Sequence, residues 1–203
     1  MIDGTALADP QWLARRVADT ARTWRHDDPR VIGTLWWYIA SHTVFDEAIG
    51  ALAATGRAPD PTLAVMEVDA KADGGLASVT SSRTVIGTEA YGVALRGSLE
   101  QIVPALASVS DAAQPALWAV AVDAIANRAL QAGAPNLAEA ISDAVGPAMP
   151  EVRFVEVNHQ RFVRRASCCL IYLTGKADMC TSCPRRTPAD RAGLLAARAG
   201  LGR

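Results

Sequence analysis

The sequence DPRVIGTLWWYIASHTVFDEAIGALAATG, at positions 28–56, decides the fold class. Asp28 is a typical helix N-cap, Pro29 is favoured at the first helical position, and Gly56 is typical of a helix end. The residues between them are mainly apolar, which predicts a long helix that runs to about Ala54 and ends near Gly56. We also expect this helix to break around Ser41–Thr43.

Further helices are predicted on both sides of this one. Upstream, Asp9-Pro10 repeats the start signal, and apolar residues follow at three- and four-residue steps to about Arg25. Downstream, Ser110-Asp111 is expected to cap an Ala-rich helix that reaches Gln131. The other predicted helices cover 98–109, 136–145 and the tail at 187–203.

Two stretches have the composition of β-strands. Residues 63–68 and 78–86 are rich in β-branched side chains, and Asp73-Gly74-Gly75 lies between them, which predicts a short hairpin. After Pro150, alternation over 152–163 predicts one or two short strands. The fold class expected is mainly α with a small β component (α+β), with a helical body and a C-terminal cysteine-rich loop.

These elements predict a single domain over 1–203 with three parts. The helical body covers 1–150 and contains the expected β-hairpin near 63–95. A cysteine segment follows at 151–186, and a final helix or tail covers 187–203. No internal repeat interrupts this order.

Composition excludes several classes of protein. The chain has 203 residues, 50% of them hydrophobic, and a formal net charge of −1. This apolar fraction excludes a disordered chain, and the charge excludes a generic nucleic-acid binder. The longest charge-free stretch, 31–45, is shorter than the roughly 20 apolar residues that a membrane span needs. The first residues show no secretory signal pattern, so we expect a cytoplasmic protein.

The cysteine segment differs from the rest of the chain in charge. Residues 153–186 carry a net charge of +5, whereas the remainder carries −6. All the cysteines of the chain lie within this basic stretch. The sequence therefore predicts a positively charged region on an acidic body.

The cysteines form a C-C-x10-C-x2-C pattern at Cys168, Cys169, Cys180 and Cys183. Thiolates are soft ligands for zinc, copper(I) or iron–sulfur clusters, and their number here, without a secretory signal, favours a metal over disulfides. Adjacent Cys168 and Cys169 reach one centre only if the backbone bends sharply, and structural zinc sites normally use spaced pairs. A redox cluster is favoured over three alternatives: a zinc knuckle, a vicinal disulfide with a redox pair, and inert core cysteines.

The segment FVRRASCCLIY at 162–172, followed by CTSCP at 180–184, resembles the C-terminal signature of the FhuF-type ferric-siderophore reductases. The resemblance implies a [2Fe–2S] cluster whose ligands are Cys168, Cys169, Cys180 and Cys183. It also implies an oxidoreductase that reduces iron(III) in an imported siderophore by one electron. Iron(II) binds hard oxygen donors far more weakly, so reduction releases the iron in the cytoplasm.

Basic residues near the cysteines are candidate substrate contacts. The candidates are Arg164, Arg165, His159, Lys176, Arg185 and Arg186. The arginines are expected to raise the cluster potential and to attract an anionic chelate or an acidic electron donor. Trp36-Trp37 is interpreted as a buried helix face rather than a stacking site.

The partners expected are a ferric siderophore and a separate electron donor, such as a ferredoxin or flavin reductase, because the chain has no NAD or ATP motif. Peripheral contact with a siderophore importer is also expected, and binding to nucleic acid is not. Two alternative functions stay open. One is an iron–sulfur electron-transfer or sensor protein without a chelate substrate, and the other is a zinc-stapled interaction domain.

Overall fold

The computed structural model describes residues 1–201, and most of them are helical. The predicted class, mainly α with a minor β component, is confirmed. The α-helices are α1 Pro10–Trp24, α2 Pro29–Thr55, α3 Thr88–Ser110, α4 Gln114–Gln131, α5 Asn136–Val145 and α6 Pro188–Leu201. The short 3-10 helices are η1 Gly4–Ala8, η2 Leu63–Val65 and η3 Ile171–Thr174.

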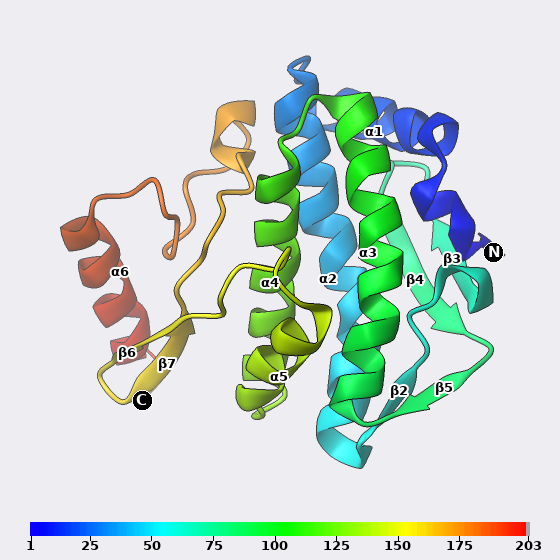
Figure 1. Ribbon diagram of the computed structural model, residues 1–203. Coiled ribbons are helices and arrows are strands. Elements are labelled where there is room, and N and C mark those ends of the chain that lie inside the picture. Colours follow the sequence, from blue (N-terminus) through cyan, green and yellow to red (C-terminus); the bar gives the residue numbers. More distant parts are fainter. Residues whose placement is uncertain (202–203) are drawn as a thin grey trace.

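The strands form small antiparallel sheets. They are β1 Ile2–Asp3, β2 Arg57–Pro59, β3 Met66–Ala70, β4 Leu76–Ser81, β5 Thr84–Ile86, β6 Phe154–Val157 and β7 Gln160–Val163. One sheet has the order β1-β3-β4, and the others are the pairs β2-β5 and β6-β7. Figure 1 shows β3, β4 and β5 on one side of the central helices and the β6-β7 hairpin with α6 on the other.

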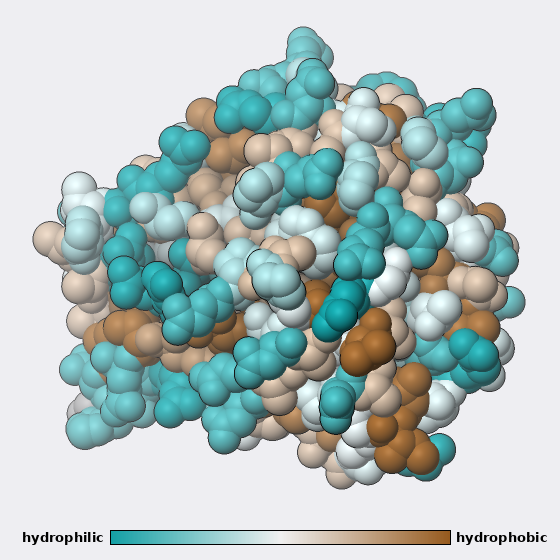
Figure 2. All heavy atoms as spheres, in the orientation of Figure 1, coloured by the Kyte–Doolittle hydropathy of each residue, from teal (hydrophilic) through white to brown (hydrophobic). Residues whose placement is uncertain are grey.

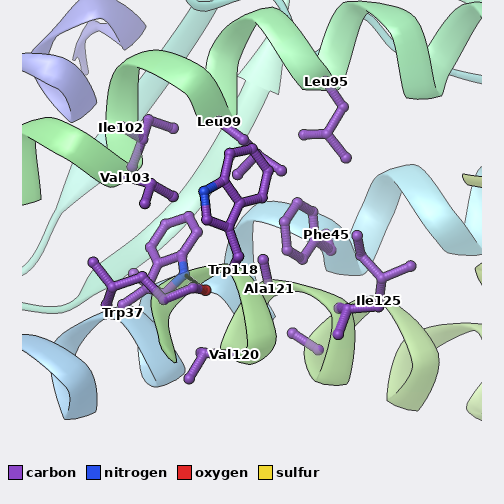
Figure 3. Packing of buried hydrophobic residues seen from close by; sticks show 14 of the residues in the cluster. Trp37, Phe45, Leu95, Leu99, Ile102, Val103, Trp118, Val120, Ala121 and Ile125 are labelled. Carbon is purple, nitrogen blue, oxygen red and sulfur yellow. Dashed lines mark hydrogen bonds between the residues drawn. The ribbon is translucent and has the colours of Figure 1, made fainter. Parts of the chain in front are cut away.

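The core lies where α2, α3 and α4 meet. Trp37 and Phe45 of α2 pack with Leu99 of α3 and with Trp118 and Ile125 of α4, as the close-up in Figure 3 shows. Trp36 and Trp37 are both almost fully buried, which confirms their interpretation as a helix face. Each full burial of such a large side chain contributes about 2–3 kcal/mol, so this body is held together by apolar packing.

The helix boundaries differ from the prediction in two places. Helix α2 continues through the expected break at 41–43, because the residues on both sides are packed in the core. The Ser41 hydroxyl donates to the Tyr38 carbonyl, so this buried polar group has a partner within the helix. Helix α3 begins at Thr88, ten residues before the predicted start, and runs to Ser110. Asp111 therefore ends α3 in the left-handed conformation, with a φ of 54°, instead of capping α4.

The remaining elements follow the prediction more closely. Strands β3 and β4 form the expected hairpin, whereas β5 leaves it to pair with β2. Helix α5 has its predicted bounds, and the predicted tail helix is observed as α6, with positions 202–203 outside the described residues. No helix within 1–201 has the length and apolar character required to cross a membrane.

Candidate metal centre

The cysteine segment leaves the body through the β6-β7 hairpin. Val155 pairs with Phe162, and the Arg164 N–H donates to the Arg153 carbonyl at 2.8 Å, which extends the pairing beyond β7. Val163 at the end of β7 is buried against the core. The hairpin thus delivers the residues after Arg164 to the surface of α4. Figure 2 shows hydrophilic and hydrophobic residues side by side over the part of the surface where the hairpin lies.

Two of the cysteine sulfurs lie at a distance suited to one metal ion. The Sγ atoms of Cys168 and Cys183 are 3.6 Å apart. Two thiolates bound at about 2.3 Å to one tetrahedral metal lie about 3.8 Å apart. The first and last cysteines of the motif are therefore placed to share a metal.

The other two sulfurs lie around one guanidinium. Nη1 of Arg165 is 3.4 Å from Sγ of Cys180 and 4.0 Å from Sγ of Cys169. All four cysteines are free thiols in this structure, so no disulfide competes with a ligand role.

The backbone turns sharply at the adjacent cysteines, as their spacing requires. Leu170 adopts the left-handed conformation with a φ of 62°, which costs a branched side chain about 1–2 kcal/mol. Its N–H points back to Sγ of Cys168 at 3.4 Å. The turn thus supplies a backbone donor to a sulfur ligand.

Arginine side chains stabilise the backbone of the second half of the motif. The Cys183 N–H donates to the Cys180 carbonyl at 3.2 Å, closing the C-x-x-C turn. Arg186 donates to the carbonyls of Cys180 and Met179, and Arg191 of α6 donates to the Cys183 carbonyl. These arginines hold the loop that presents Cys180 and Cys183.

A buried ion pair joins the cysteine segment to α4. Nε of Arg165 lies 3.4 Å from a carboxylate oxygen of Asp123, and both side chains are only 4% exposed. The same carboxylate accepts the N–H groups of Ala166 and Ser167, at 2.8 and 3.1 Å. Asp123 therefore fixes the backbone immediately before Cys168.

The protonation of this pair follows from its surroundings. Burial raises the pKa of Asp123, while the Ala166 N–H and the Arg165 guanidinium oppose that shift. Burial acts to lower the pKa of Arg165, but Asp123, Cys169, Cys180 and Tyr38 together raise that pKa above its usual value. The guanidinium also lies over the Tyr38 ring, 5.0 Å from its centroid. Arg165 is therefore a permanent cation below the sulfurs.

The chemistry of the donor set fits a [2Fe–2S] cluster. The Cys168 thiol lowers the pKa of its neighbour Cys169, against the effect of burial and with help from Arg165, which favours the thiolate form that a metal binds. Nη2 of Arg165 is buried without a hydrogen-bond partner among residues 1–201, and a sulfur-rich anion beside it would accept that bond. Cys168, Cys169, Cys180 and Cys183 are the residues that would hold the cluster.

The cysteine sulfurs are not gathered around a single point. Across the described residues, no three His, Cys, Asp or Glu side chains converge on one point suited to an ion. A [2Fe–2S] cluster instead spreads its four thiolates over two iron atoms.

The predicted substrate contacts lie in different places. Arg185 is exposed beside Cys183, and Arg164 is exposed while Arg165 is buried. Arg186 is engaged with backbone carbonyls, and Lys176 donates to the carbonyl of Thr23 in α1. His159 lies in the turn of the β6-β7 hairpin, with a φ of 64°. The structure does not bring these six side chains together.

Two cavities border the cysteine segment. One, of about 500 Å³, lies between the first turns of α2 and α4 and the segment, and Cys168 is part of its wall. We call it the Cys168 cavity. The second, of about 390 Å³, is lined by arginines that include Arg164 and Arg165, together with Glu151.

Asp123 is not among the functional residues that the sequence predicted. Its signal is an acidic residue in the middle of the apolar run WAVAVDAIA at 118–126, where a solvated helix face would show more polar residues. A buried carboxylate requires a partner, but the sequence does not show that the partner is Arg165, 42 residues away.

Comparison with protein families confirms the resemblance in the sequence. Residues 165–185 match the family model of the FhuF 2Fe-2S C-terminal domain. The matched range begins at Arg165 and includes all four cysteines. No curated protein matches the chain. The cysteine segment is therefore an FhuF-type domain, and its cofactor is a [2Fe–2S] cluster.

Proposed function

We propose that this protein, an iron–sulfur protein with an FhuF-type domain, is a ferric-siderophore reductase. It adds one electron to iron(III) held by a siderophore, and the product is iron(II), which the hard oxygen donors bind far more weakly. The chelator itself is left chemically unchanged. The observation that carries the proposal is that Cys168, a ligand of the FhuF-type centre, forms part of a cavity wall.

The residues around the centre are suited to electron transfer. When bound, a [2Fe–2S] cluster supplies a one-electron donor at low potential. Asp123 and Arg165 hold the cysteine segment on α4 through a rigid, buried contact, so the sulfurs keep their positions when charge changes. Arg165 places positive charge against the thiolates, which favours the more negative, reduced state.

Each electron must come from outside the chain. We propose a ferredoxin-like or flavin reductase as donor, because its own electrons can be passed singly to the centre. The proposed location is the cytoplasm, where an importer delivers the ferric siderophore.

The test is the visible spectrum of anaerobically purified protein with iron and sulfide assays. About two iron and two sulfide per chain, with bleaching by dithionite, establish the cluster. Ferric chelates are then added to the reduced protein, and the return of colour is followed with time. Rapid reoxidation with iron(II) trapped in stoichiometric amount supports the proposal.

Two outcomes would overturn it. Slow reoxidation by every ferric chelate, with fast reoxidation by protein acceptors, would identify an electron-transfer protein. A colourless protein that contains one tightly bound zinc would identify an interaction domain. The variant Cys183→Ser, which removes a ligand, is the control for reduction without a cluster.

A further inference from the structure

The exposure of the cysteines limits where a substrate can approach. Cys169 and Cys183 are 3% and 1% exposed, whereas Cys168 and Cys180 are half-buried. The Arg165 guanidinium lies against Cys180, and Arg186 covers the carbonyl of the same residue. Cys168, in contrast, opens into a cavity. A small molecule in the Cys168 cavity would contact a ligand of the centre directly.

The charge of this cavity is not balanced. Arg30 of α2 and Arg185 are the charged residues in its wall, and no Asp or Glu is among the described residues that line it. Arg30 makes only a long contact of 3.4 Å with Asp28, in which both side chains are about half exposed. The neighbouring cavity has four arginines in its wall, but Arg153 is paired there with Glu151 and Arg165 with Asp123, and none of its described lining residues is a cysteine. Of the two, the Cys168 cavity is the one in which a bound anion would meet a cysteine.

Apart from Thr34 and Ser167, the rest of the wall is apolar. Pro115 and Ala116 of α4 face the cavity together with Leu170 and Pro184 of the cysteine segment. The volume, about 500 Å³, is within the range of roughly 300–1,000 Å³ found for small-molecule sites. Small and apolar residues leave room for the arms of a chelator, while the arginines lie at its margin.

We propose that the Cys168 cavity binds the ferric chelate, and that Arg30 and Arg185 make it select chelates with net negative charge. This inference rests on the proposed reductase function and adds the site and the substrate class. The arginines act on binding through charge, and Ala116 acts by leaving space.

Binding is measured apart from reduction by using gallium(III), which resembles iron(III) but is not reduced under these conditions. The probes are the gallium complexes of desferrioxamine B, which carries one positive charge, and of its N-succinyl derivative, which carries one negative charge. They share the same metal-binding groups. On the cluster-loaded protein we expect the anionic complex to bind about tenfold more tightly than the cationic one.

Single variants then locate the site. Arg30→Ala and Arg185→Ala should each weaken the anionic probe about threefold and leave the cationic probe unchanged or slightly tighter. Ala116→Phe, at a half-buried position of the wall, should weaken both probes by more than tenfold. Arg153→Ala, beside the neighbouring cavity, is the matched control and should change neither. The [2Fe–2S] spectrum and the melting temperature of each variant verify that the protein is intact.

The outcomes separate this inference from the proposed function. If ferric complexes of the same chelators reoxidise the reduced protein but the variants bind both probes like the wild type, the reductase function holds and this site is wrong. Equal affinity for the two probes would refute the charge selection. If no chelate reoxidises the protein, the proposed function itself fails.

Discussion

The helical body and the cysteine segment are held in place by different forces. The body buries a continuous apolar core from α2, α3 and α4, in which Trp36, Trp37 and Tyr91 are almost fully buried. The segment contributes few buried apolar residues, and polar contacts attach it to the body through Asp123 and Lys176. Apolar burial can therefore fold the body alone, whereas the segment needs a polar anchor and its metal centre.

Loss of the cluster is expected to have the largest effect, and this effect should be confined to the cysteine segment. Cys183→Ser should abolish the visible absorption, because it deletes one of four thiolates. Metal binding at such sites contributes about 10 kcal/mol or more to local folding. We therefore expect hydrogen-exchange protection to be lost over 151–186, while the body keeps its helical circular dichroism. Simultaneous loss of protection in α2 and α4 would contradict the view that the body folds without the metal centre.

Asp123→Asn tests the polar anchor. The amide cannot balance the buried Arg165 cation and offers one acceptor oxygen to the N–H groups of Ala166 and Ser167. Breaking a buried pair costs about 3–5 kcal/mol, so we expect faster loss of the cluster to a chelator and a lower urea midpoint.

The matched control for this variant is Asp46→Asn. Asp46 of α2 likewise pairs with an arginine, Arg128 of α4, at 3.0 Å. The Asp46 side chain, however, is 63% exposed. Exposed pairs contribute about 0–1 kcal/mol. Equal effects of the two substitutions would show that the Asp123 contact is no stronger than a surface pair.

His42 gives the body a dependence on pH. Burial lowers the pKa of His42 to about 4; the nearby Arg128 and Arg165 lower it further, whereas Asp46 opposes the shift. The imidazole ring also packs against Tyr38 in a T-shaped arrangement. The unfolded chain binds a proton at about 6.5, so stability is complete above that pH and declines as the pH falls towards 4. With allowance for partial exposure the loss is about 2 kcal/mol. Urea unfolding of the apoprotein across this range should show it, and His42→Phe should remove it.

Arg165→Lys changes the sulfur environment and keeps the charge. Lysine does not reproduce the guanidinium contacts with Asp123, Cys169 and Cys180. Fewer donors to the sulfurs should lower the cluster potential by about 50 mV, which is about 1.2 kcal/mol for one electron. Potentiometric titration measures the shift. Arg164→Lys, at the exposed neighbour, should change the potential much less.

Local signals predicted much of this molecule. Asp9-Pro10 and Asp28-Pro29 mark helix starts, since each aspartate accepts backbone N–H groups of the first turn. The cysteine spacing predicted the FhuF-type segment, which the family match confirms, because cysteines close in sequence need only a turn to meet. The Leu170 conformation supplies that turn.

Features that depend on distant contacts were not predictable. The start of α3 carries no side-chain cap, and Gly92 weakens its helical signal. The structure explains this glycine, because a Cβ there would lie 2.5 Å from the Ala144 Cβ of α5. The pairing of Asp123 with Arg165 is likewise long-range, and so is the approach of Arg30 to the cysteine segment.

Helix α4 carries both a wall residue of the Cys168 cavity and the anchor of the cysteine segment, so it sets the distance between them. Ala116 borders the Cys168 cavity, and Asp123 anchors the cysteine segment from the same face of the helix. Seven residues separate them, which is two turns or about 10.5 Å. Deleting one residue between them would rotate Asp123 by about 100° around the axis and turn its carboxylate away from Arg165. The distance between the cavity and the anchor is therefore fixed by helical geometry.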